Sequence, residues 1–426
     1  MTEKTYFILS IVVFVGVYAL IIWDKFDRAV VALSGATLMV LFRILDQKEA
    51  FADIDYNTLG LLVAMMIIVA IIRRTGLFEY LGVKIVKISK AEPFRLLILL
   101  SITTGIFSAF LDNVTTILLI LPVILSVTKD LKLNPVPFII ASVFASNAGG
   151  TATLIGDPPN ILIGSKTGLT FMQFLVNDGV IVFPLLIMSA FIFAFMYRKS
   201  LVTEDSLKEK VLNTDEKECI KDHQLMNKSL IVFGLVIVGF FLHGLLGFES
   251  STVALTGAVV LLFISGINSE LVFMEIEWKT LFFFAGLFVI VGGIESTGVI
   301  TMLAEFVIKA TGGNLLLTAV AILWVSALAS AFIDNIPFVA AMIPLIVDMG
   351  NMSSLNITPL WWALSLGACL GGNGTIIGAS ANVVATGIAE RNDHKITFGY
   401  YFKTVFPVML LTIAICTVYI IVAYVI

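Results

Sequence analysis

Three aspartates interrupt stretches of the chain that are otherwise strongly apolar: Asp112, Asp157 and Asp334. An ionisable side chain inside a membrane is costly and indicates a function by default. The polar breaks around these aspartates hold no Lys or Arg, so the carboxylates would repel a multiply charged anion unless cations accompany it. We expect the three aspartates to bind the coupling cation, a proton or Na⁺, with each of them a candidate Na⁺ ligand. The alternative for each is a structural role, in which the carboxylate accepts bonds from backbone amides.

Glycines, amides and hydroxyls surround these aspartates in four polar breaks. Glycine permits an unwound backbone whose carbonyls can bind a cation, while the N-termini of half-helices can receive an anion. For Asn147, Asn160 and Asn382, each taken alone, a helix cap is the simpler interpretation, but four breaks together favour a binding site. The predicted substrate-binding residues are Asn113, Thr115, Thr116, Asn147, Gly149, Gly150, Thr151, Thr153, Gly156, Asn160, Asn335, Gly371, Gly372, Asn373, Thr375, Gly378, Ser380 and Asn382.

The composition places the chain in a membrane. Hydrophobic residues make up 59% of it and charged residues 13%, whereas soluble domains have about 25% charged residues. The net charge of −4 provides no basic surface for a nucleic acid. Cysteines and histidines are scattered without metal spacing, and no nucleophile lies beside a base in the sequence, so we expect neither a resident cofactor nor an enzyme.

About ten apolar windows are long enough to cross a bilayer, which takes roughly 20 helical residues. Two further stretches, 94–128 and 313–350, are each divided by a polar tip into arms that are short for a crossing. We expect both to be re-entrant hairpins, because irregular backbone at that depth needs protein or water around it. The windows 136–165 and 357–390 are predicted to be broken helices. The other windows lie near 6–22 (a retained first helix), 28–45, 57–72, 178–197, 230–246, 250–268, 279–294 and 404–426.

The sequence repeats itself at an offset of 222 residues. SAFLDNVTT aligns with SAFIDNIPF, and GGTATLIGDPPN at 149–160 aligns with GGNGTIIGASAN at 371–382. Asp157 faces Ala379 in this alignment, which favours a coupling role for Asp157 over a symmetric structural one.

Each copy of the repeat holds five spans and one hairpin, and because five is odd the second copy must be inverted in the membrane. Residues 1–197 form the first repeat, 229–426 the second, and 198–228 a linker with seven basic and seven acidic residues. Inverted repeats with broken helices are the architecture of secondary transporters, whose site lies between the repeats. A channel, or a binding protein without turnover, is the alternative.

The basic residues predict the orientation of the chain. With both termini outside, all but five of the 26 Lys and Arg residues lie in inner loops, and positive charge collects on the cytoplasmic side of membrane proteins. We therefore expect the N- and C-termini outside and the linker 198–228 in the cytoplasm, in a cell inner (plasma) membrane. The five outer residues are Lys4, Arg43, Lys48, Lys166 and Lys309.

The motifs DNVTTILLILPV, GGTATLIGDPPN, SAFIDNIPFVA and GACLGGNGTIIGASANVVATGIAE resemble those of the ion transporter superfamily that includes ArsB-type arsenite permeases and NhaD-type sodium/proton antiporters. Residues 367–390 are most similar to its P protein branch. The resemblance covers nearly the whole chain outside the linker. It implies an elevator-type carrier, often dimeric, with the site in a mobile domain. The more distant divalent-anion:sodium symporters have uncharged hairpin tips where this chain has Asp112 and Asp334, which argues against sodium-coupled dicarboxylate uptake.

Extrusion of arsenite or antimonite coupled to H⁺ or Na⁺ is the leading expectation, because neutral trihydroxyarsenic needs hydrogen-bonding oxygens and amides rather than a fixed positive charge. Sodium/proton exchange is the second, and symport of an inorganic or carboxylate anion the third. No GxxxxGK[ST] motif is present, so ATP could enter only through a separate soluble ATPase subunit. The expected partners are a small inorganic solute, the coupling cation, the lipid bilayer and a second copy of the chain.

Overall fold

The computed structural model describes residues 2–23, 25–213, 216–353 and 355–424, so the outermost positions of both predicted repeats and residues 214–215 of the linker lie outside the described residues. Every regular element in these ranges is helical. Nine of the described helices are long and apolar enough to cross a membrane, which confirms an all-α, multi-pass membrane protein.

The first half contains α1 (Glu3–Trp23), α2 (Arg28–Leu41), α3 (Gln47–Ala52), α4 (Tyr56–Arg73), α5 (Leu77–Ser89), α6 (Pro93–Ser108), α7 (Asn113–Asp130), α8 (Val136–Thr151), α9 (Pro158–Thr167), α10 (Phe171–Phe174), the π-helix Leu175–Gly179 and α11 (Val180–Tyr197).

The second half follows the first at the offset seen in the sequence. α5 and α17 have bounds that differ by 222 positions, and so do α7 and α19. The two hairpins, α6–α7 and α18–α19, each end two residues beyond their predicted limits. The linker contains α12 (Asp205–Leu212) and a short 3-10 helix (Glu216–Cys219), and the second half contains α13 (His223–Leu246), α14 (Ser250–Ser265), α15 (Ser269–Phe273), α16 (Trp278–Ser296), α17 (Val299–Thr311), α18 (Leu315–Phe332), α19 (Asn335–Met352), α20 (Thr358–Gly371), a 3-10 turn (Gly372–Gly374), α21 (Ser380–Arg391) and α22 (Phe398–Tyr424).

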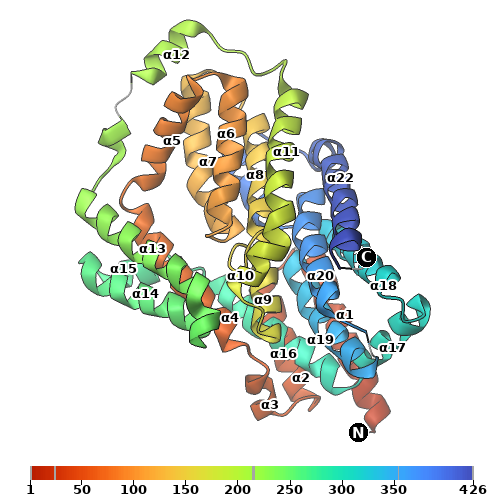
Figure 1. Cartoon of the computed structure of the whole chain (residues 1–426). Coiled ribbons are helices and arrows are strands. Elements are labelled where there is room, and N and C mark those ends of the chain that lie inside the picture. Colours follow the sequence, from red (N-terminus) through yellow and green to blue (C-terminus); the bar gives the residue numbers. More distant parts are fainter. Residues whose placement is uncertain (1, 24, 214–215, 354, 425–426) are drawn as a thin grey trace.

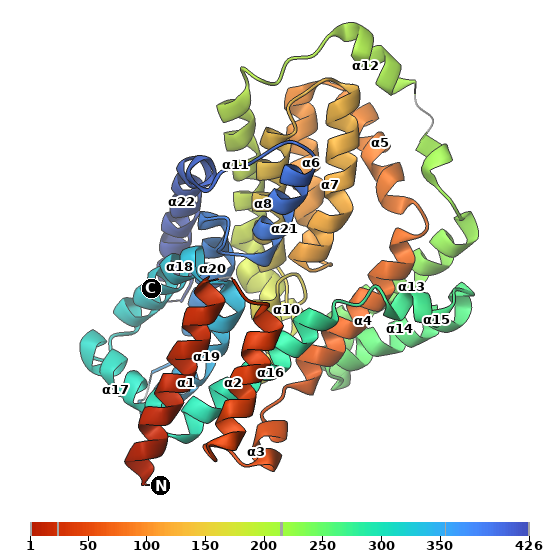
Figure 2. The same ribbon diagram turned by 180° about the vertical axis from the view of Figure 1, so that it is seen from behind.

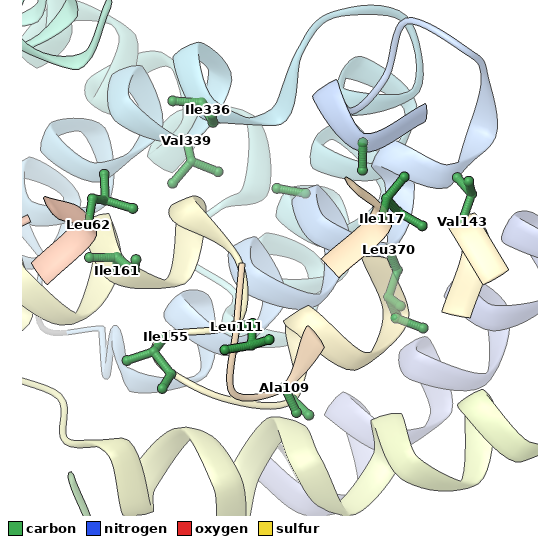
Figure 3. Packing of buried hydrophobic residues seen from close by; sticks show 14 of the residues in the cluster. Leu62, Ala109, Leu111, Ile117, Val143, Ile155, Ile161, Ile336, Val339 and Leu370 are labelled. Carbon is green, nitrogen blue, oxygen red and sulfur yellow. The ribbon is translucent and has the colours of Figure 1, made fainter. Parts of the chain in front are cut away.

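Two sets of helices make up the molecule (Figures 1 and 2). In the first set, α6 and α7 pack against α8, which packs on α11, and in the second half α18 and α19 pack against α20, which packs on α22. In the other set, helices from opposite halves pair: α2 packs on α16, and α4 packs on α14. Buried apolar residues of both halves form one continuous cluster. Leu111, Ile155 and Leu370 belong to its part around the hairpin tips and helix breaks (Figure 3).

The membrane segment that contains α11 begins earlier than the hydropathy of the sequence predicts. The predicted window starts at 178, but the helical segment runs from Phe171 to Tyr197. In the sequence, the polar pair Asn177-Asp178 marks the N-terminal limit of the apolar window. The structure includes both residues in the π-helix and buries Asp178.

Two glycines let the hairpins approach the broken helices at backbone distance. A Cβ on Gly149 of α8 would lie 1.9 Å from the carbonyl oxygen of Gly105 in α6. A Cβ on Gly371 of α20 would lie 2.5 Å from the Cα of Ala327 in α18. Gly149 and Gly371 are among the predicted substrate-binding residues, and the structure places both within helices, where they permit close helix packing.

We expect Gly149→Ala to lower the free energy of unfolding by about 1–3 kcal/mol, the usual cost of extra volume in a packed interior. Gly387→Ala in α21 is the matched control, because nothing lies within 4 Å of its added Cβ and alanine favours a helix by up to about 1 kcal/mol. Thermal unfolding of both purified variants in one detergent measures the difference. Equal stability of the two variants would contradict close packing at Gly149.

The linker is fastened to the first half of the chain rather than being a free tether. From α11 it passes through α12 beside α5 and then enters α13 (Figure 1). Lys208 Nζ lies 2.9 Å from the Glu92 carboxylate, and Lys87 forms an ion pair with Glu216. These contacts join the linker to the loop before α6 and to α5.

Gly76 fits against the end of the linker. Its φ is +82°, and a Cβ there would lie 2.0 Å from the carbonyl oxygen of Cys219, near the amide of Lys221 that donates to the Thr75 carbonyl at 2.9 Å. We expect Gly76→Ala to release this part of the linker and to increase its cleavage by trypsin severalfold. Gly168→Ala is the control, since its φ of +71° brings the same backbone strain, about 1–2 kcal/mol, with no atom within 4 Å. Equal cleavage of the two variants would show that the contact is dispensable.

Candidate functional site

Four helices begin around one cavity between the two halves. They are α7, α9, α19 and α21, and each broken helix continues against the opposite hairpin, α9 against α19 and α21 against α7. Residues at their N-terminal ends line a cavity of about 170 Å³. Because a helix N-terminus carries partial positive charge, these ends favour acidic side chains here. The polar lining residues are Asp112, Asn113, Asp157, Glu277, Thr280, Asn335 and Ser380.

Asp112 and Asp334 cap the second helices of the two hairpins. The Asp112 carboxylate accepts a hydrogen bond of 2.9 Å from the backbone amide of Thr115, and the Asp334 carboxylate accepts one of 3.1 Å from the amide of Ile336. Caps of this kind satisfy helix amides that would otherwise lack a partner inside a membrane. Both aspartates therefore have a structural role.

Asp157 is placed differently. Its side chain is 0% exposed, and no amide of its own helix α9 caps its carboxylate in the described chain. Instead, the side-chain nitrogen of Asn335, from the opposite hairpin, lies 3.4 Å from each of its carboxylate oxygens. These contacts are long and therefore weak. Among the three predicted aspartates, Asp157 is thus the one whose carboxylate is least committed to backbone structure.

A basic residue reaches the site from outside the breaks, which corrects the expectation of a site without bases. Nη1 of Arg28, the first residue of α2, lies 2.7 Å from Oδ2 of Asp334, and the Ser380 hydroxyl donates to the same oxygen at 2.9 Å. The Arg28 side chain is 23% exposed and that of Asp334 2%. Because Arg28 balances the charge of Asp334, this carboxylate is not free to bind a coupling cation in this conformation.

A second cavity, of about 310 Å³, lies beside this ion pair and shares Ser380 with the first. It is lined by Asp27, Arg28, Lys279 and Asp334 among others. Lys279 Nζ lies 2.6 Å from the carboxylate of Asp27, and this ammonium group holds the pKa of Asp27 below its usual range. Among the described lining residues, the only charged side chains of the first cavity are therefore carboxylates, while the second cavity has paired charges of both signs.

Glu277 is a cavity residue that the polar breaks do not predict. It immediately precedes α16 and lines the cavity together with Asp112 and Asp157. The Thr280 hydroxyl donates to its carboxylate at 3.1 Å. At the offset of 222 it corresponds to Asp55, which caps α4. The signal in the sequence that could indicate Glu277 is therefore the acid that precedes the corresponding helix in both halves.

The acids of the site do not converge on one point. Within the described ranges, no three acidic, cysteine or histidine side chains are close enough to hold a metal ion together. Asp112, Asp157 and Asp334 therefore do not share one metal site in this conformation.

Amide side chains join the two halves behind the cavity. Asn113 Nδ2 donates to Asn147 Oδ1 at 3.1 Å. Asn147 Nδ2 lies 3.0 Å from Asn373 Oδ1 and 2.8 Å from Asn382 Oδ1. All four side chains are buried. These hydrogen bonds therefore connect the first hairpin tip to the helix break of the second half.

Asn160 and Asn382 hold the backbone of the two breaks. Asn160 Nδ2 donates to the carbonyls of Thr151 and Thr153 at 3.0 and 2.9 Å, and Asn382 Nδ2 donates to that of Thr375 at 2.8 Å. These carbonyls are satisfied by protein groups, so they are not open to a substrate. The simpler interpretation of both asparagines, a structural one, fits this geometry.

The predicted substrate residues thus fall into two groups. Asn113, Asn335 and Ser380 line the main cavity, and Thr115 borders a small cavity next to Glu277. The others are buried away from these cavities, because they stabilise the breaks and the helix packing. They are Thr116, Asn147, Gly149, Gly150, Thr151, Thr153, Gly156, Asn160, Gly371, Gly372, Asn373, Thr375, Gly378 and Asn382.

Known proteins share this sequence and architecture. The family described as CitMHS, citrate transporter, matches residues 18–367. The chain is 42% identical over 420 residues to an uncharacterized transporter of Mycobacterium bovis, and 40% identical over 420 residues to a 46 kDa membrane protein of Mycobacterium leprae, with 97% of each chain covered in both cases. It is 34% identical over 507 residues to the P protein of Homo sapiens, covering 99% of this chain and 60% of that protein. The solved YdaH transporter of Alcanivorax borkumensis has a TM-score of 0.60 and 16% identity, covering 95% of this chain and 98% of that one, which shows a shared fold.

Proposed function

This chain belongs to the CitMHS (citrate transporter) family, within the ArsB/NhaD-type ion transporter superfamily, and we propose that the acid-lined cavity of this secondary transporter couples the movement of a small solute to a proton or Na⁺. The observation that carries the proposal is the lining of the cavity. Asp112, Asp157 and Glu277 share a space of about 170 Å³ with no lysine or arginine among its described lining residues. Carboxyl groups that line one cavity favour binding of a proton or a cation there, since both reduce their mutual repulsion.

We propose a neutral trihydroxy compound of arsenic or antimony as the leading substrate. Asn113, Asn335, Thr280 and Ser380 offer the amides and hydroxyls that such a solute requires. A neutral solute needs no fixed positive charge, and the described residues that line the cavity include none. Efflux would then be driven by a proton or Na⁺ moving inward at Asp157.

Two observations keep other solutes as candidates. The three carboxyl groups would also suffice for sodium/proton exchange, in which the acids themselves are the transport site. Arg28 and Lys279 line the second cavity, and a guanidinium group can bind a carboxylate through two parallel hydrogen bonds, that is, in a bidentate manner. An anionic solute, such as the citrate in the family description, would bind there if Asp334 released Arg28.

We propose that access alternates by an elevator movement between the two sets of helices. Support comes from the position of the main cavity. Leu62 and Met66 of α4 and Thr280 of α16 line it together with the hairpin tips at Asn113 and Asn335. A displacement of the hairpins and broken helices along α4 and α16 would carry the tips from one membrane face toward the other.

The test uses purified protein in sealed liposomes that contain a pH-sensitive dye. Gradients of Na⁺, Li⁺, arsenite and citrate are imposed one at a time. Proton movement that requires arsenite supports the leading proposal, movement with Na⁺ alone supports exchange, and movement that requires citrate supports anion symport. If no gradient moves protons, although the protein is folded and inserted, proton-coupled transport at this cavity is contradicted.

A further inference from the structure

Another buried carboxyl group lies outside both cavities. Asp178 belongs to the π-helix between α10 and α11, and its side chain is 0% exposed within the membrane segment. π-turns inside α-helices are rare and frequently occur at functional sites. At the offset of 222 the position corresponds to Tyr400, so the acid is specific to the first half.

No cation compensates this carboxyl group in the described part of the chain. The titratable groups that face it are Cys369 on α20 and Cys416, Tyr419 and Tyr424 on α22, none of which is basic. Its Oδ1 atom has no hydrogen-bond partner among the described residues. A charged carboxylate with an unbonded oxygen is expensive inside a membrane, so the surroundings favour the protonated form.

The hydrogen bonds around Ser365 are compatible with the same protonation state. Ser365 Oγ lies 2.7 Å from Asn160 Oδ1 and 2.5 Å from Asp178 Oδ2. The orientation of the Asn160 amide is fixed, because its nitrogen donates to two backbone carbonyls of the helix break. A serine hydroxyl has one hydrogen and can donate to only one of the two oxygens. If it donates to Asn160, the short contact to Asp178 requires a hydrogen on the carboxyl group.

We propose that Asp178 is a proton-binding site, with its proton on Oδ2 donated to Ser365 and the Ser365 hydrogen donated to Asn160. Loss of the proton to water would leave a carboxylate that attracts the Ser365 hydrogen. Asn160 Oδ1 would then keep only the thiol of Cys369, 3.5 Å away, as a donor. The thiol of Cys369 also contacts Asp157.

The protonation state of Asp178 is thereby transmitted to the helix break that ends at Asp157. Asn160 holds the carbonyls of that break, and Cys369 lies between Asn160 and Asp157. Only this last step, from proton binding to coupling, rests on the proposed function. Proton binding itself stands independently of any solute.

Infrared difference spectroscopy of the purified full-length protein at neutral pH tests the proposal. We expect the wild type minus Asp178→Asn spectrum to contain one C=O band of a protonated carboxyl group. In Ser365→Ala the same band should move to a higher frequency, because the carboxyl group loses its acceptor. Absence of the band from the difference spectrum, or a band that Ser365→Ala leaves in place, would overturn the proposal.

One further variant serves as the control for this experiment. Asp348→Asn is the matched control, because this acid of α19 is bonded to Thr301 at 2.8 Å, away from both cavities, and should leave the band unchanged. If Asp178→Asn fails to fold, the shift in Ser365→Ala decides alone. Since no solute is added, a negative result here leaves the transport proposal standing, and failure of transport leaves this band in place.

Discussion

Replacing Asp157 by asparagine should reduce solute-driven proton movement by at least about tenfold, which corresponds to about 1.4 kcal/mol of lost interaction, while the protein remains folded. The substitution keeps the size of the side chain and removes the charge that a proton or cation would neutralise. The long contacts to Asn335, of 3.4 Å, contribute little to stability, so the fold does not depend on the carboxylate. The rate in liposomes and the thermal unfolding of the same preparation give the two readouts.

Asp348→Asn provides the comparison for that experiment. It removes one carboxylate from α19 outside both cavities and should leave the rate near that of the wild type. Equal rates for Asp157→Asn and the wild type would show that proton coupling does not require this carboxylate.

Arg28→Gln should destabilise the protein by about 2 kcal/mol. It leaves the carboxylate of Asp334, which is 2% exposed, without its cation. Breaking a fully buried pair costs about 3–5 kcal/mol. The loss expected here is smaller than that range because the Arg28 side chain is itself 23% exposed. Thermal unfolding in detergent measures the loss.

The double variant Arg28→Gln/Asp334→Asn separates the ion pair from other roles of Arg28. Removing both charges should restore part of the stability, because an uncompensated buried charge no longer remains. A double variant as unstable as the sum of the two single variants would mean that the ion pair contributes no coupling energy.

Much of the architecture could be predicted from the sequence because the chain repeats itself. The offset of 222 residues follows from short motifs, and the bounds of α7 and α19 keep it. Polar tips in apolar stretches predict where the hairpins turn, and the structure places Asp112 and Asp334 at the starts of α7 and α19. These features are local in sequence, so spacing and hydropathy suffice to find them.

The partners of these residues could not be predicted, because they come from distant segments. Arg28 and Asp334 are 306 positions apart, and nothing in the motif around Asp334 indicates a guanidinium group. A glycine such as Gly149 can serve either an unwound backbone or a close helix crossing, and only the position of Gly105 distinguishes the two. The burial of Asp178 could not be predicted either, since a single acid at the edge of an apolar window resembles a loop residue.

The exchange of protons at the main cavity is tested most directly by binding, without transport. Purified protein in weakly buffered detergent solution is mixed with arsenite, Na⁺ or citrate while the pH is recorded, for the wild type, Asp157→Asn and Asp348→Asn. We predict a change in bound protons on binding of the true solute in the wild type and in Asp348→Asn, and none in Asp157→Asn. The same proton change in Asp157→Asn as in the wild type, or solute binding without any proton change, would contradict proton coupling at this carboxylate.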